Sequence, residues 1–131
     1  IGSLRSLDNM TLLWMQKNFV STYTNQMAET AYICGNPLSA EALDDGDFLE
    51  LDEVWEYIWK DLGTVPPRAI TDRTIAAARE HQPDRLIAHY MQPHCPFISR
   101  PNLTRGKHLG QIWESRVGRR VAETPGRQGI K

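Results

Sequence analysis

One stretch, residues 64–97, limits the possible folds of this chain more than any other. Near its start, Pro66 and Pro67 break the preceding element, and a helical pattern then follows that ends near His81. After a Gln-Pro-Asp breaker, the mostly apolar run of residues 86–91 is typical of a strand buried on both faces. A helix that leads into such a strand predicts an α/β fold with a parallel sheet.

The same periodicity predicts further helices. We expect Thr71 or Asp72 to cap the helix that ends near His81. Large apolar residues recur at spacings of three or four over residues 9–28, which predicts one long amphipathic helix there. Residues 54–62 repeat the pattern with bulky aromatic side chains, which are far more often core than part of a cofactor site.

A second strand is predicted at residues 32–34, where a short apolar run stops at Gly-Asn-Pro. Residues 41–53 hold seven acidic residues and no basic one, without the spacing of an EF-hand, so we expect a solvated acidic loop there. Two strands cannot form a sheet covered on both faces, because each leaves unpaired backbone groups at its edges. The chain is therefore expected to be an incomplete part of a larger layered fold, in which a mostly parallel sheet is flanked by helices.

The length of 131 residues suits a single domain. We expect residues 1–104 to form the partial α/β domain and residues 105–131, which are basic and contain several glycines, to be a partly flexible C-terminal segment. A formal net charge of −1 provides no general attraction to nucleic acid, so nucleic-acid binding through residues 105–131 ranks behind the other hypotheses.

The two cysteines favour a reducing compartment. Cys34 and Cys95 lie far apart and form no CxxC pair, and we find neither a membrane span nor a secretion signal. A cytoplasmic protein without a membrane partner is therefore expected. The chain begins with Ile1 rather than methionine, which indicates a processed or fragmentary chain.

Two loops follow the predicted strands, and ligands of open parallel sheets bind beyond the carboxyl ends of the strands. The first loop contains Asn36 and the second contains His94, so both side chains are candidates for one crevice. Pro93 and Pro96 stiffen the second loop around His94. A rigid imidazole in this position suits hydrogen bonding to an anionic oxygen, or proton transfer.

Other reactive side chains near this loop are interpreted as structural. We expect His89 to be a core or sheet-face histidine with a satisfied hydrogen bond, too far from His94 to share a metal ion with it. Cys95 is interpreted as a bystander, because a neighbour in sequence does not point its side chain at the thiol. No catalytic residue and no metal ligand are identified.

Residues 69–97, AITDRTIAAAREHQPDRLIAHYMQPHCPF, resemble a segment of the sulfatase-like branch of the alkaline phosphatase superfamily. In that segment a Thr-Asp-capped helix leads into a buried strand that ends in a Pro-His-x-Pro loop. The earlier ETAYICGNP is similar to the strand before another active-site loop, and the resemblance, which includes uncharacterised archaeal members, covers about residues 20–98. It implies an α/β sandwich that hydrolyses sulfate or phosphate esters at a divalent-metal site, with His94 contacting the anionic oxygens.

Several parts of that family pattern are missing. Gly35-Asn36-Pro37 replaces the usual lysine and histidine, so Asn36 is a second possible substrate contact that carries no charge. No Cys-x-Pro-Ser-Arg nucleophile segment, early Asp-Asp pair or late Asp-His-Gly segment is present, and hydrolysis needs such groups. We therefore expect a fragment or degenerate member that is inactive alone. The alternative is a non-enzymatic interaction domain that completes its sheet as a homo-oligomer or with another partner.

Overall fold

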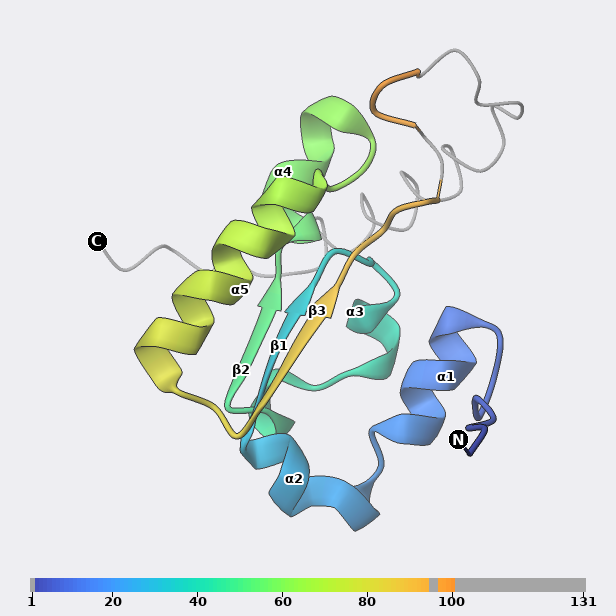
Figure 1. The fold of residues 1–131 in the computed structure, drawn as a ribbon, viewed down its shortest axis with the longest axis vertical. Helices are drawn as coiled ribbons and strands as arrows, with labels where there is room; N and C mark the ends of the chain where they lie inside the picture. Colours follow the sequence, from blue (N-terminus) through green and yellow to red (C-terminus); the bar gives the residue numbers. More distant parts are fainter. Residues whose placement is uncertain (1, 95–96, 101–131) are drawn as a thin grey trace.

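The computed structural model describes residues 2–94 and 97–100, without the side chains of residues 60–62. It is an α/β fold in which helices pack against a three-stranded parallel sheet (Figure 1). The strand order is β2-β1-β3, with β1 (Thr30–Cys34) between β2 (Glu50–Glu53) and β3 (Arg85–His89). The predicted α/β class and parallel sheet are confirmed, whereas the predicted number of two strands is wrong.

Helices cover both faces of the sheet (Figure 1). One face packs against α4 (Trp55–Leu62) and α5 (Pro67–His81), and the other against α1 (Thr11–Asn18), α2 (Thr24–Ala28) and α3 (Ser39–Ala42). All five residues of β1 are buried, because β1 is the central strand. Single turns of 3-10 helix occupy Ser21–Tyr23 and Asp45–Asp47.

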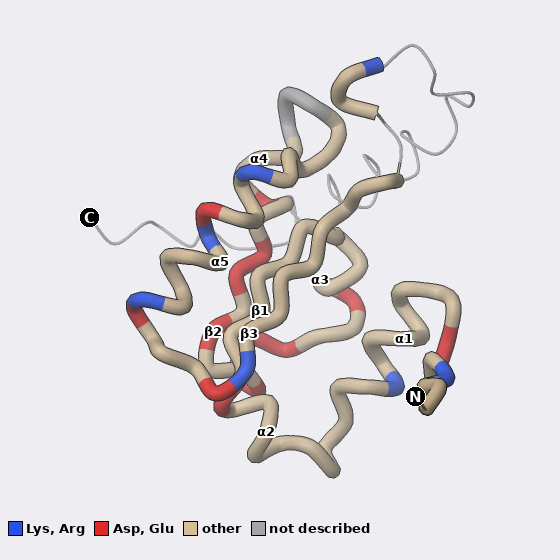
Figure 2. Tube along the Cα trace, in the orientation of Figure 1, with Lys and Arg blue, Asp and Glu red and all other residues tan. Residues whose placement is uncertain are grey.

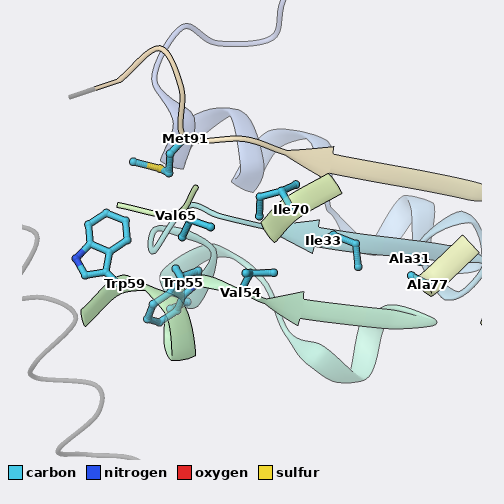
Figure 3. Packing of buried hydrophobic residues seen from close by; sticks show 10 residues of the cluster. Ala31, Ile33, Val54, Trp55, Trp59, Val65, Ile70, Ala77 and Met91 are labelled. Carbon is cyan, nitrogen blue, oxygen red and sulfur yellow. The ribbon is translucent and has the colours of Figure 1, made fainter. Parts of the chain in front are cut away.

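The core on the α4 and α5 face contains Trp55, the largest fully buried side chain among the described residues. Ile33 of β1 and Ile70 of α5 are fully buried and belong to one cluster with Trp55 and Trp59 (Figure 3). Trp55 also donates an indole hydrogen bond of 3.0 Å to the Ser39 hydroxyl. The prediction that these aromatic residues form core is confirmed. Gly63 ends α4 with a φ of 63°, a conformation that favours glycine.

The acidic stretch of residues 41–53 was predicted as a solvated loop, and this is wrong for its last four residues, which form β2. Leu51 packs with the cluster on the α1 side of the sheet. Glu50 and Asp52 face the other way, where Arg73 of α5 forms ion pairs with both. Arg73 thus pairs with the charged side of the strand from a helix about 20 positions further along, a contact that the local sequence does not reveal.

The long helix predicted over residues 9–28 is also wrong, because it is broken between α1 and α2. Phe19 leaves the helical conformation (φ −104°, ψ 78°) and Val20 is extended (φ −119°, ψ 160°). The Phe19 ring packs 5.3 Å from the Tyr32 ring and 5.4 Å from the Phe48 ring, measured between ring centres. The helix is interrupted at Phe19 because the interruption lets this ring be buried among the other aromatic rings.

The α5–β3 unit matches its prediction except at the ends. The helix begins at Pro67 rather than at Thr71 or Asp72, with extended Pro66 before it, because proline suits the first helical position. The strand ends at His89, two residues before the predicted end, and it is not buried on both faces, since Leu86 is 38% exposed. Cys95 and residues 105–131 lie outside the described residues.

Candidate functional site

The two candidate loops begin side by side at the carboxyl edge of the sheet. Cys34, the last residue of β1, lies opposite His89, the last residue of β3. The backbone N–H of Gly35 then donates a hydrogen bond of 2.9 Å to the carbonyl of His89. The loops that carry Asn36 and His94 therefore leave the same end of the sheet, as expected for loops that follow parallel strands.

Gly35 leaves little space for a side chain at the point where these loops separate. A Cβ atom added here would lie 3.1 Å from the carbonyl oxygen of His89 and 3.1 Å from a side-chain carbon of Ile70. Both distances are tighter than ordinary contacts of a Cβ atom. The absence of a side chain lets β1, β3 and α5 approach one another closely.

Asn36 is buried, with 7% of its surface exposed, and it organises the turn into α3. Its side-chain oxygen accepts a hydrogen bond of 3.0 Å from the backbone N–H of Leu38, and its carbonyl accepts one of 3.1 Å from that of Ser39. The carboxamide is therefore held in place by its acceptor atom. This leaves the Nδ2 group as the part of the side chain that is suited to donate to a ligand.

His94 is exposed in the loop after β3, and its backbone N–H donates a hydrogen bond of 2.9 Å to the carbonyl of Met91. The loop is anchored by Gln92, whose side-chain amide donates to the carbonyl of Val65 at 3.0 Å and to the hydroxyl of Thr64 at 3.4 Å. The anchor joins the loop to the α4–α5 connection. The backbone before His94 is thus fixed on a buried support.

A polar cluster that sequence reasoning did not identify lies directly below this edge. The Nδ1 atom of His89 is 2.8 Å from the Tyr32 hydroxyl and 3.8 Å from the Cys34 sulfur. The rings of Tyr32 and His89 are stacked at 14°, with 6.1 Å between their centres. The prediction that His89 is a sheet-face histidine with a satisfied hydrogen bond is confirmed. Alternation along β1 puts Tyr32 and Cys34 on one face, but the place of His89 beside them depends on the β1–β3 register.

Burial keeps the three side chains of this cluster uncharged. It lowers the pKa of His89 and raises the pKa of Tyr32 well above its ordinary value. Burial also raises the pKa of Cys34 to about 11. At neutral pH the cluster is therefore a set of neutral hydrogen-bonding groups. Such groups can hold the ends of β1 and β3 together, but the protonated Cys34 thiol cannot act as a nucleophile.

A cleft of about 480 Å³ lies beside β3. Residues 87–90 line one side of it, residues 8–11 and Trp14 line the other, and Tyr32 also contributes. At the start of α1, the Asp8 carboxylate accepts hydrogen bonds from the backbone N–H groups of Asn9 and Met10. The ammonium group of Lys17 lies 2.7 Å from the same carboxylate and is the largest cause of its lowered pKa. The hydrogen bond from the backbone N–H of Met10 is the next largest cause.

The divalent metal that the family resemblance implies has no ligand set in this part of the chain. Within residues 2–94 and 97–100, no group of three or more histidine, cysteine, aspartate or glutamate side chains is arranged to hold a metal ion. The carboxylates of β2 have other partners. Asp52 and Glu50 pair with Arg73, and Glu53 accepts a hydrogen bond from the Ser39 hydroxyl. The described residues therefore do not fit a metal centre.

Comparisons with known proteins add no family to this description. The chain matches no protein-family model, no curated protein and no solved structure at a significant level. Of the helices in the described ranges, none has both the length and the apolar character that crossing a bilayer requires.

Proposed function

We propose that this chain supplies the anion-binding edge of a sulfatase-like α/β hydrolase, with His94 as the main contact to a sulfate or phosphate ester and Asn36 as the second. The observation that carries the proposal is the side-by-side start of the two loops, with Cys34 opposite His89. Ligands of open parallel sheets bind at this edge. On this proposal the three-stranded sheet is part of a larger sandwich like that of the alkaline phosphatases.

The two side chains offer the donors that an oxyanion needs. An imidazole N–H and a carboxamide N–H both donate hydrogen bonds, and those made to a charged acceptor are the stronger kind. The turn that fixes the Asn36 oxygen on Leu38 leaves its Nδ2 group to donate. Glu53, opposite Cys34 on the β2 side, would repel an anion, so the bound oxyanion is placed on the β3 side of Asn36, toward His94.

The chain alone is proposed to bind such an anion without hydrolysing its ester. Hydrolysis in this chemical class needs an activated nucleophile and a metal ion or an equivalent charge. The described residues hold no metal-ligand cluster. Cys34 is fully buried and its thiol has a pKa of about 11, so it does not serve as the nucleophile.

Calorimetric titration of the chain with inorganic sulfate and with inorganic phosphate tests the proposal. We expect binding that weakens roughly tenfold in His94→Ala, since losing a hydrogen bond to a charged group costs at least about 1.4 kcal/mol. Asn36→Asp keeps the acceptor for Leu38 but replaces the donor by a negative charge, and we expect it to abolish binding. His81→Ala is the matched control, because it removes an imidazole from the end of α5.

Three outcomes would count against the proposal. Absence of any anion binding by the wild-type chain would refute it. If His94→Ala bound the anion as tightly as the wild-type chain, the anion would bind at a different site. Hydrolysis of a nitrophenyl sulfate or phosphate with added divalent metal, lost in His94→Ala, would keep the site but contradict the expected inactivity.

A further inference from the structure

The two outer strands of the sheet, β2 and β3, differ in chemical character (Figure 2). Their outer sides are called the β2 edge and the β3 edge. β2 reads Glu-Leu-Asp-Glu, so three of its four residues are acidic. β3 reads Arg-Leu-Ile-Ala-His, and its only charged residue under neutral conditions is Arg85 at the start. Charges on an edge strand oppose pairing with another chain, whereas an apolar edge invites it. The β3 edge is therefore the one suited to a further strand.

The outer side of β3 carries backbone groups for which residues 2–94 and 97–100 provide no hydrogen-bond partner. The N–H of Arg85 donates to the carbonyl of Glu29, and the carbonyl of His89 accepts from Gly35, so both of these groups point toward β1. Because backbone groups alternate in direction along a strand, those of Leu86 and Ala88 point the other way. Within the described residues, β3 has a strand neighbour on the β1 side alone.

The side chains along this edge leave apolar surface uncovered by the described residues. Leu86 and Tyr90 are each 38% exposed, and both lie on the α5 side of the sheet, where the Tyr90 hydroxyl is 2.9 Å from that of Thr71. On the α1 side, the cleft of about 480 Å³ runs along residues 87–90, opposite residues 8–11 and Trp14. Both faces of β3 thus have uncovered surface next to its outward backbone groups, and a further strand would lie about 4.8 Å from them.

We propose that β3 pairs antiparallel with β3 of a second copy of this chain, with Ala88 of one copy opposite Ala88 of the other. This register brings the outward backbone groups of both strands together in hydrogen-bonded pairs. It also sets Leu86 opposite Tyr90 of the other copy, so that the exposed apolar residues on the α5 face cover each other. No like charges are opposed, and the contact closes on itself about a two-fold axis.

Sedimentation velocity from micromolar to millimolar concentration tests this interface. We expect the wild-type chain to shift toward twice the mass of a single chain as its concentration rises. Ala88→Pro removes an N–H that points away from β1, so it spares the β1–β3 ladder, and we expect a monomer throughout the range. Leu86→Lys replaces an exposed apolar side chain of β3 by a charged one, which opposes strand pairing, so this variant is also expected to be monomeric.

A matched control places the same change at the opposite edge. Leu49, just before β2, is 44% exposed, and Leu49→Lys is expected to leave the wild-type dimerisation unchanged. Circular dichroism of every variant establishes that loss of the dimer is not loss of the fold. A wild-type chain that stays monomeric at all concentrations overturns the proposal, as does a dimer that persists in both folded variants, Ala88→Pro and Leu86→Lys.

Hydrogen exchange provides a residue-level readout of the same interface. The amide of Ala88 is expected to gain protection as the protein concentration rises, because it is bonded only in the dimer. The amide of Ile87 points toward β1 and should be protected at every concentration. Protection of Ala88 that does not depend on concentration would assign its partner within one chain and overturn the proposed pairing.

Discussion

The Tyr32 hydroxyl and the His89 Nδ1 atom lie 2.8 Å apart, although 57 positions separate the two residues in the sequence. Their hydrogen bond joins β1 to β3 just below the edge that carries both candidate loops. Both groups are largely buried, and among the described residues the only other hydrogen-bonding contact of this nitrogen is the weak one with the Cys34 sulfur at 3.8 Å. Tyr32→Phe should lower the free energy of unfolding by about 1–2 kcal/mol, because it leaves a buried nitrogen without its partner. Urea denaturation at neutral pH measures this loss, and an unchanged midpoint would contradict it.

The buried histidine also makes stability depend on pH. Burial lowers the pKa of His89 in the folded chain, while the unfolded chain titrates near the ordinary value of about 6.5. The unfolded state therefore binds more protons below that value, and stability should be complete above about pH 7 and fall as the pH drops toward 5. His89→Gln, which cannot titrate, should flatten this part of the stability profile. An equally steep profile in the variant would assign the pH dependence to other groups.

Arg73 of α5 pairs with two carboxylates of β2, and His81 at the end of the same helix also lies 3.1 Å from one of them, that of Glu50. Arg73 bonds to Asp52 and lies 3.5 Å from Glu50, and the bond to Asp52 raises its own pKa. Arg73→Ala should destabilise the chain by about 1–2 kcal/mol, since it leaves two neighbouring carboxylates without this partner. The comparison is Arg68→Ala, which breaks an exposed pair with Asp72 and should change stability by less than about 0.5 kcal/mol. Equal effects of the two substitutions in urea denaturation would contradict the role of Arg73.

A side chain at Gly35 should destabilise the chain. The added methyl group of Gly35→Ala would press against the backbone of His89 and the side chain of Ile70, at a cost of about 1–3 kcal/mol. Gly46→Ala is the control, because its Cβ would meet one side-chain oxygen of Asp44 at 3.4 Å. Thermal unfolding of both variants distinguishes the two sites, and equal melting temperatures would show that the β1–β3 junction is looser than described.

The thiol of Cys34 should not react with thiol reagents while the chain is folded. It is fully buried, and burial raises its pKa to about 11, so little thiolate exists at pH 8. In a Cys95→Ser background, we expect a maleimide reagent to label Cys34 only after denaturant is added. Rapid labelling of the native protein, followed by mass spectrometry, would indicate that the β1 end opens.

The parts of the fold that the sequence predicts are those with local signals. The α5–β3 unit follows from proline positions and an apolar run, and the shared edge of the two loops follows from parallel strands. β2 was missed because its acidic residues suit a strand only when Arg73, more than 20 positions later, pairs with them. The break at Phe19 depends on its distant contacts with Tyr32 and Phe48. The Tyr32–His89 cluster needs the β1–β3 register, which no local pattern contains.

The place of β1 in the middle of the sheet has a consequence for the order in which the chain is completed during synthesis. Both neighbours of β1 follow it in the sequence, and the second, β3, ends at His89. Contacts between segments this distant form slowly, because a long loop must close before they are gained. A nascent chain therefore keeps the β3 side of β1 unpaired until residue 89 has been synthesised, and exposed apolar strands of this kind are prone to aggregate.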